Sequence, residues 1–177
     1  MLKVTAKGID CAALRGDRGG LTLIGRICRF LSIPRRPEQK EGRPRLVRIL
    51  VVDDNPAVRH YLRGLLEQRS TWWVCDEAPT GGEALERVKE HPPDMILLDF
   101  QMPDVNGIDV ARQVSHLFPD IPILMVTIHL NNQLAQEARK VGIRGVCSKS
   151  DVGSIVEAVD TLLQHGSYFP QMGSVSH

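Results

Sequence analysis

Several residues with chemically reactive or metal-binding side chains directly follow short apolar runs in this 177-residue sequence. Asp53 and Asp54 follow the run LVRILVV, and Asp99 follows MILL. A hydroxyl group at Thr127 and an amine at Lys149 come at the ends of two later runs. A lone aspartate in such a place is commonly a turn residue or a helix cap. Here, however, groups of complementary chemistry follow four of five runs, so we treat them as one candidate site.

The residue types indicate a particular chemistry. Three carboxylates held close together repel one another, which raises their pKa values. A hard divalent cation relieves this repulsion, and Mg²⁺ takes carboxylates together with water and phosphate oxygens as ligands. One carboxylate can then attack a phosphoryl group while the cation and a lysine neutralise the phosphoryl oxygens. A threonine hydroxyl can hydrogen-bond the product. The set predicts phosphoryl transfer to an aspartate with Mg²⁺.

Such a site needs a fold that gathers the ends of several strands. From Leu46 onward, short apolar runs alternate with segments of helical periodicity. We expect strands at 46–52, 71–78, 94–98, 121–126 and 143–147, and helices at 57–66, 80–90, 107–117, 132–141 and 151–164. This alternation predicts an α/β fold, a doubly wound five-stranded parallel sheet covered by helices on both faces. Sites in such sheets lie at the carboxyl ends of the strands.

Polar residues before three of these helices are candidate N-caps, because a side-chain oxygen there can accept from a free backbone N–H. The candidates are Asp53 or Asp54 for the first helix, Thr80 with Glu83 as capping-box partner for the second, and Ser150 or Asp151 for the last.

The sequence resembles the receiver domain of two-component response regulators over about residues 46–165. The matching stretches are ILVVDDNPAVR (49–59), DMILLDFQMPDVNGID (94–109), ILMVT (123–127) and GVCSK (145–149). The closing stretch IVEAVDTLLQHGSYFP is similar to the last receiver helix of the subgroup that carries a helix-turn-helix output domain. The resemblance implies a flavodoxin-like fold and a signalling role rather than an enzyme.

The resemblance also implies a role for each matched residue. Asp99 is the implied phosphoacceptor, and Thr127 and Lys149 are the implied contacts of the phosphoryl group. The implied Mg²⁺ ligands are Asp53, Asp54, Asp99 and the backbone oxygen of Gln101. Val146 stands where the family usually has an aromatic residue that changes rotamer, and Ile128 stands where it favours a small residue. We therefore expect a smaller conformational switch because of Val146, and narrower access to the acceptor because of Ile128.

Charge divides the chain into two parts. Residues 1–48 contain 12 Lys and Arg against 4 Asp and Glu, whereas the remainder contains 10 against 17. We expect a basic extension and linker at 1–45, a receiver domain at 46–166 and a short tail at 167–177. Residues 23–31 have the spacing of a basic amphipathic helix, either a membrane-surface or partner-binding helix or a poorly ordered leader. We favour the leader, because unanchored termini are commonly disordered, and expect no membrane contact.

Three function classes fit these residues. The first is a stand-alone cytoplasmic receiver, phosphorylated by a histidine kinase or phosphotransfer protein, that signals to an unidentified downstream protein or a second copy of the chain. We expect no DNA-binding output domain and no direct DNA binding. The second is a phosphorylation-independent interaction module of the same fold. The third is an aspartyl-phosphate phosphatase of the haloacid-dehalogenase type, which the motif order disfavours because that class has its nucleophile after the first strand.

Overall fold

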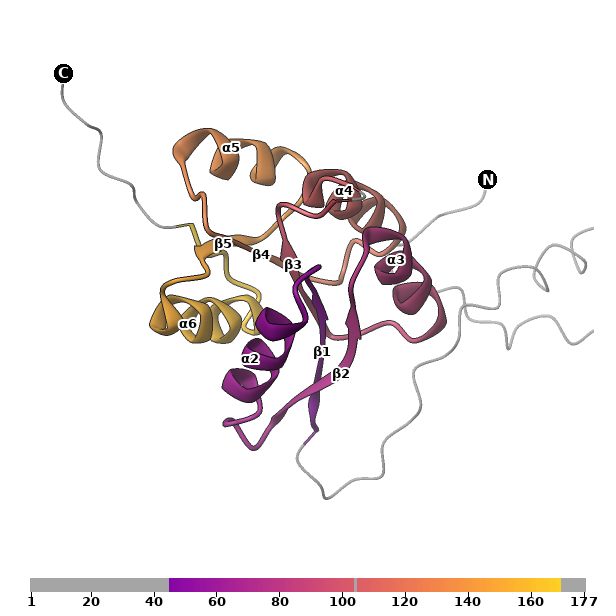
Figure 1. Cartoon of the computed structure of the whole chain (residues 1–177), viewed down its shortest axis with the longest axis vertical. Coiled ribbons are helices and arrows are strands. Elements are labelled where there is room, and N and C mark those ends of the chain that lie inside the picture. Colours follow the sequence, from indigo (N-terminus) through magenta and orange to yellow (C-terminus); the bar gives the residue numbers. More distant parts are fainter. Residues whose placement is uncertain (1–44, 104, 170–177) are drawn as a thin grey trace, which may run out of the picture. The chain divides into compact units, whose positions relative to one another are not determined.

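The structure, a computed structural model, describes residues 45–103 and 105–169, in which strands and helices alternate as predicted (Figure 1). The strands are β1 (Val47–Val52), β2 (Trp72–Ala78), β3 (Met95–Asp99), β4 (Ile123–Thr127) and β5 (Gly145–Ser148). The helices are α2 (Pro56–Leu66), α3 (Gly81–Glu90), α4 (Gly107–Leu117), α5 (Asn132–Lys140) and α6 (Val152–Leu163). The predicted amphipathic helix at 23–31 and the predicted linker lie outside the described residues.

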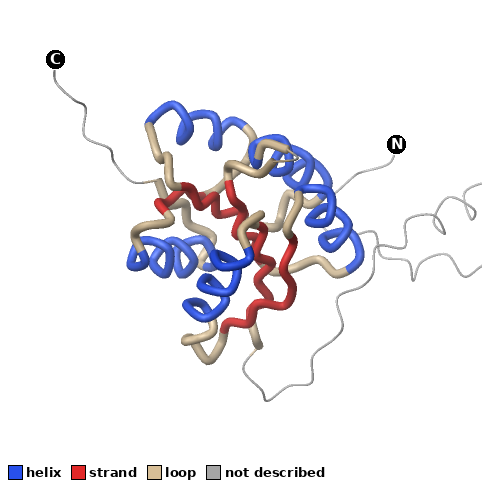
Figure 2. Tube along the Cα trace, in the orientation of Figure 1, coloured by secondary structure: helices blue, strands red, loops and turns tan. Residues whose placement is uncertain are grey.

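The five strands, red in Figure 2 and labelled in Figure 1, form one parallel sheet in the order β2-β1-β3-β4-β5. The chain moves from β1 outward to β2, returns to β3, and continues through β4 and β5 in the opposite direction. The predicted doubly wound sheet is therefore confirmed. The direction changes between β1 and β3, and this is where open α/β sheets hold their ligands.

Helices cover both faces of the sheet (Figure 1). Buried residues of α2 and α6 share a core with Ile49 and Val51 of β1, whereas buried residues of α3, α4 and α5 share a core with Leu50 and Val52. Successive side chains of a strand point to opposite faces, so a strand between two helical layers must be apolar at nearly every position. This explains why the strands appear as unbroken apolar runs in the sequence.

The N-cap of α2 is Asn55, so the prediction that Asp53 or Asp54 caps this helix is wrong. The Asn55 side chain accepts a hydrogen bond from the backbone N–H of Ala57 at 2.9 Å. Pro56 then opens the helix, where its missing N–H costs nothing and its fixed φ suits the first turn. The two aspartates are thereby left outside the helix, with their carboxylates available for other contacts.

The other two caps agree with prediction. Thr80 caps α3, since its hydroxyl accepts from the N–H of Glu83 at 3.2 Å. Of the two candidates for α6, Asp151 is the cap, and its carboxylate accepts from the N–H of Ser154 at 3.1 Å. The Glu83 carboxylate accepts from Arg87 at 3.0 Å, and its role as capping-box partner of Thr80 stays a prediction.

Three strands, β3, β4 and β5, end one residue later than the apolar pattern predicts. Asp99 is the last residue of β3 and pairs with Val126, and Thr127 is the last residue of β4 and pairs with Ser148. The hydrogen-bonded ladder continues for as long as the neighbouring strand offers a partner, whatever the polarity of the side chain. Asp99 and Thr127 are consequently held by the sheet rather than by loops.

The residues after α6 return to the sheet. Tyr168 forms a parallel bridge with Gly145, with hydrogen bonds of 2.8 Å to the N–H of Val146 and 2.9 Å to the carbonyl of Arg144. Phe169 packs against the core beneath α5, and the Arg139 guanidinium lies 4.1 Å from the centre of its ring. These contacts cover the open edge of β5.

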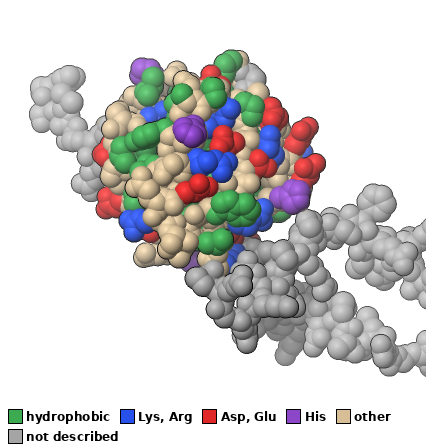
Figure 3. Space-filling model, turned by 60° about the horizontal axis from the view of Figure 1, so that its bottom comes forward, with side chains coloured by type: hydrophobic (Ala, Val, Ile, Leu, Met, Phe, Trp, Pro, Cys, Tyr) green, Lys and Arg blue, Asp and Glu red, His purple; other side chains and the backbone are tan. Residues whose placement is uncertain are grey.

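The surface of the described domain carries both signs of charge. Acidic and basic side chains lie interspersed among apolar ones on the face drawn in Figure 3. Among the described residues, no helix is both long enough and apolar enough to cross a membrane.

Candidate functional site

Three carboxylates converge at the carboxyl end of the sheet. Asp53 follows β1 and Asp99 ends β3, and these strands are paired neighbours with Val52 opposite Leu98. One carboxylate oxygen from each of Asp53, Asp54 and Asp99 lies within 4.8 Å of the others. Asp53 and Asp99 are only 1% and 5% exposed, whereas Asp54 faces solvent. We call these three residues the acidic pocket.

Lys149 extends its ammonium group into the acidic pocket. Its Nζ lies 2.6 Å from Oδ2 of Asp53 and 2.9 Å from Oδ2 of Asp99. The backbone N–H of Lys149 donates to the carbonyl of Thr127 at 2.9 Å, so β4 holds the start of this side chain. Burial lowers the pKa of Lys149, but the hydrogen bonds and charges of Asp53 and Asp99 outweigh it and raise that pKa above its ordinary value. The ammonium is charged at neutral pH.

Asp99 is held in a setting that resists ionisation. Burial raises the pKa of its carboxyl group, and the negative charge of Asp53 adds to the rise. The hydrogen bond and charge of Lys149 and the backbone N–H of Gln101 act in the opposite direction without cancelling it. The pKa of Asp99 therefore lies above its usual range, the behaviour expected of a buried carboxylate beside a like charge. A cation placed among these oxygens would favour the charged form.

Thr127 is buried at the end of β4, one residue beyond the partner of Asp99 in the sheet. Its hydroxyl oxygen accepts from the backbone N–H of His129 at 3.1 Å, which leaves the hydroxyl proton free to donate elsewhere. The structure thus brings Thr127 and Lys149 to the carboxyl end of the sheet, where the acidic pocket lies. All five residues of the candidate site that the sequence pattern predicted, the three aspartates, Thr127 and Lys149, meet at this end of the sheet.

Gly107 lets the loop after β3 pass close to Asp99. A Cβ atom at this position would lie 2.1 Å from the backbone oxygen of Asp99, closer than any side chain can approach. The N–H of Gly107 donates to the carbonyl of Phe100 at 2.9 Å, and Gln101 bridges to Asn106, whose side chain caps α4. The loop that carries Gln101 is therefore tightly folded around the end of β3.

The two residues that depart from the resembled family lie in different surroundings. Ile128, directly after Thr127, is 63% exposed. Val146, in β5, is fully buried and belongs to the core shared with α3, α4 and α5. At Val146 the chain thus has an aliphatic core residue whose backbone N–H is bound to Tyr168.

The sequence pattern did not single out Arg59, which lies in the first turns of α2. Arg59 contacts the backbone of Asp53 and Asp54, which we call the acidic pair. The available signal was its spacing, because a basic residue five positions after Asp54 and one turn into a helix can reach back to the preceding loop.

Comparison with known proteins decides the family. The model of the response regulator receiver domain family matches residues 49–160. The chain belongs to this family. This receiver is similar to the transcriptional regulatory protein DegU of Brevibacillus brevis, with 30% identity over 123 residues that cover 69% of the chain and 52% of the relative. It is also similar to the transcriptional regulatory protein LnrK of Bacillus subtilis, with 33% identity over 126 residues that cover 71% of the chain and 57% of the relative.

A solved structure agrees with the fold. The crystal structure of a LuxR-family two-component response regulator from Aurantimonas sp. SI85-9A1 matches the receiver with a TM-score of 0.67 and 32% identity, over 70% of this chain and 89% of that one. The chain spans about half the length of the curated relatives named above. The predicted family and fold are thus confirmed.

Proposed function

We propose that this receiver takes a phosphoryl group onto Asp99 from a histidine kinase or a phosphotransfer protein. The observation that carries the proposal is the position of the Asp99 carboxylate, which is buried beside Asp53 and lies 2.9 Å from Nζ of Lys149. A nucleophile, a neighbouring ammonium and a second carboxylate for a cation are the groups that phosphoryl transfer to an aspartate requires.

The acidic pocket fits a bound Mg²⁺ ion. Three carboxylate oxygens within 4.8 Å of one another form a hard donor set of the kind that Mg²⁺ prefers. We assign the ion to Asp53, Asp54, Asp99 and the backbone oxygen of Gln101, with water in the remaining positions. When bound, Mg²⁺ supplies positive charge for the oxygens of the transferring phosphoryl group.

The protein's own groups account for the remaining steps. A carboxylate oxygen of Asp99 attacks phosphorus, the bond from phosphorus to the donor's imidazole nitrogen breaks, and the imidazole nitrogen keeps the electron pair. The product is an acyl phosphate on Asp99. The Lys149 ammonium neutralises a phosphoryl oxygen, and the free hydroxyl proton of Thr127 is donated to another. Because Asp99 and Thr127 are buried, these interactions act with little screening by water.

We further propose that the signal leaves through the segment from Thr127 to Ser150. Phosphorylated Asp99 draws in the hydroxyl of Thr127, and one short connection of four residues leads from Thr127 to the start of α5. Only Leu134 and Ala138 of α5 are buried, so this helix has few apolar contacts to hold it in one position. The surface formed by α5 and its surroundings then binds a downstream protein or a second copy of the chain.

A small phosphodonor tests the proposal directly. Incubation with acetyl phosphate and Mg²⁺ should add one phosphoryl group to the intact protein, and mass spectrometry after hydride trapping of the acyl phosphate should locate it at Asp99. Asp99→Asn should abolish the label. Asp109→Asn, at an exposed aspartate of α4, should retain it. Labelling at another residue, or a label that survives Asp99→Asn, would rule out Asp99 as the acceptor, and steady turnover of the donor would favour a phosphatase.

One observation favours a second candidate, a phosphorylation-independent interaction module. Val146 is an aliphatic core residue where the family usually has a mobile aromatic one. A module of this kind would bind its partner through the same surface with or without a phosphoryl group. Partner binding that is equal for the phosphorylated protein and for Asp99→Asn would select this candidate.

A further inference from the structure

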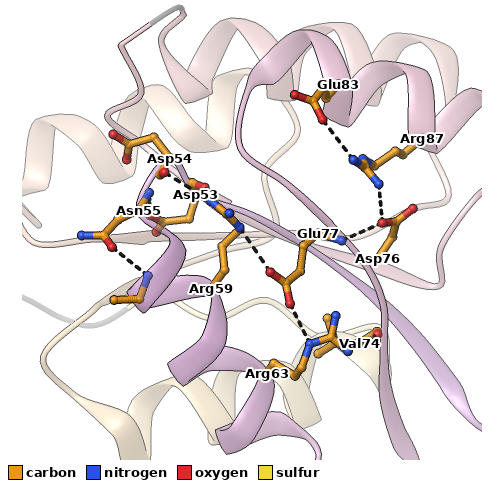
Figure 4. Close-up of polar contacts among 11 residues, drawn as sticks. Asp53, Asp54, Asn55, Arg59, Arg63, Val74, Asp76, Glu77, Glu83 and Arg87 are labelled. Carbon is orange, nitrogen blue, oxygen red and sulfur yellow. Dashed lines mark hydrogen bonds and ion pairs between the residues drawn. The ribbon is translucent and has the colours of Figure 1, made fainter.

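Arg59 contacts the acidic pair, Asp53 and Asp54, at the backbone carbonyl groups and not at the carboxylates. Its Nη1 donates to the carbonyl oxygen of Asp53 at 2.7 Å and to that of Asp54 at 3.2 Å. The side chain is largely buried, with 15% of its surface exposed. Figure 4 shows the guanidinium between the loop that carries the two aspartates and the carboxylate of Glu77.

Glu77, on β2, binds the other side of the same guanidinium. Nε of Arg59 lies 3.2 Å from Oε2 of Glu77, and Nε of Arg63 lies 2.6 Å from Oε1. Although burial raises the pKa of Glu77, the hydrogen bonds and charges of Arg63 and Arg59 lower it below its ordinary value, so this carboxylate is charged at neutral pH. Glu77 therefore anchors Arg59 and offsets its positive charge.

This arrangement restrains the direction of the two aspartate side chains. Two successive carbonyl oxygens bound to one rigid planar group limit the rotation of the intervening peptide. The Asp53 carboxylate also accepts from the N–H of Asn55 at 3.0 Å, which closes the loop in front of α2. A free arginine near a cation site would repel the cation, but Glu77 removes most of that cost by pairing with the guanidinium.

We propose that Arg59, anchored by Glu77, is a positioning residue that holds the acidic pair in the geometry needed to bind a divalent cation. The inference rests on the function proposed above, since it assigns the support for the same cation site. Replacing a group that hydrogen-bonds to metal ligands and orients them lowers the metal affinity roughly 10- to 100-fold.

Arg63 offers a matched control for Arg59. Both side chains lie on α2 and bind the carboxylate of Glu77, but Arg63 donates to the carbonyl of Val74 at 3.0 Å instead of to the acidic pair. By calorimetric titration with Mg²⁺, Arg59→Gln should weaken binding about tenfold. Arg63→Gln should leave the dissociation constant close to that of the unaltered protein.

Non-additivity tests the anchoring by Glu77. If Glu77 acts through Arg59, Glu77→Gln should weaken Mg²⁺ binding, and the double variant Arg59→Gln/Glu77→Gln should bind no more weakly than Arg59→Gln alone. A loss in the double variant equal to the sum of the two single losses would overturn the anchoring.

A measurement on metal-free protein separates this inference from the proposed function. In EDTA, hydrogen exchange of the Asn55 amide, followed by NMR, should be faster in Arg59→Gln than in Arg63→Gln. If the unaltered protein bound no Mg²⁺, the proposed function would fail while this measurement would still test the support of the loop. Equal Asn55 exchange in both variants, or Mg²⁺ affinities reduced equally in both, would overturn the role of Arg59.

Discussion

Replacing Lys149 by methionine should expose the cost of holding the acidic pocket together without a cation. Lys149 is the ammonium that the structure places between Asp53 and Asp99, at 2.6 Å and 2.9 Å. Methionine preserves most of the aliphatic length and removes the ammonium group, with its charge and its hydrogen bonds to the two carboxylates. In metal-free protein, two buried carboxylates would then face each other, with Asp54 nearby.

The expected loss follows from the burial of the pair. Removal of one partner from a buried ion pair costs roughly 3–5 kcal/mol, because the remaining charge is left unpaired. The Lys149 side chain is 16% exposed, and Asp54 shows that water reaches the mouth of the pocket, so we take the lower end, about 3 kcal/mol. With a urea m-value of about 2 kcal/mol per molar, this corresponds to a midpoint about 1.5 M lower.

The loss should depend on pH in a defined direction. The pKa of Asp99 is raised in the folded protein by burial and by Asp53. The folded state therefore loses stability as the pH rises from the ordinary aspartate pKa to the higher pKa that Asp99 has in the folded protein. Without Lys149 this fall becomes larger. The stability difference between Lys149→Met and the unaltered protein should therefore be small in acid and full at neutral pH. The stability difference should shrink again at alkaline pH, when Lys149 of the unaltered protein loses its proton. Because the pKa of Lys149 is raised in the folded protein, this happens above the ordinary lysine pKa.

Urea unfolding followed by tryptophan fluorescence would measure this, since Trp72 is buried and changes environment on unfolding. The experiment is done in EDTA at neutral and acidic pH, with Lys89→Met, at an exposed lysine of α3, as control. Addition of Mg²⁺ at 100 times its dissociation constant should restore about 2.7 kcal/mol by mass action. An unchanged midpoint in EDTA at neutral pH, or an equal loss at both pH values, would refute the reasoning.

Three further perturbations test the remaining parts of the site. Asp54→Ala should remove most of the thermal stabilisation by Mg²⁺, and a full response in this variant would mean that Asp54 is not a ligand. Gly107→Ala should lower the free energy of unfolding by about 3 kcal/mol, because its Cβ would lie 2.1 Å from the backbone oxygen of Asp99. As a control, Gly82→Ala places its Cβ in open space in α3 and should raise the free energy of unfolding by about 0.5–1 kcal/mol. Equal effects of the two substitutions in urea unfolding would contradict the packing argument. Beryllofluoride with Mg²⁺ should change hydrogen exchange mainly within residues 127–150, and unchanged exchange there with the ligand bound would favour the phosphorylation-independent module.

The alternation of elements could be predicted from the sequence because the information is local. Each strand between two helical layers must be apolar on both sides, and each helix shows one apolar stripe, so periodicity alone separates them. That the sheet is parallel followed from the same pattern, since a helix between two strands allows a parallel crossover. The strand order β2-β1-β3-β4-β5 came from the tertiary structure. Convergence of Asp53, Asp99 and Lys149 on one edge then required only that all strands point the same way.

Other features depended on which partner each group meets in the folded chain. Asn55 rather than Asp53 caps α2 because Pro56 sets where the helix begins, although either residue could serve by type. Asp99 ends β3 because the neighbouring strand offers it a partner at Val126. The link from Arg59 to Glu77 joins α2 to β2 across 18 positions. Local sequence patterns do not encode such contacts, because they arise only when packing fixes the distance between separate elements.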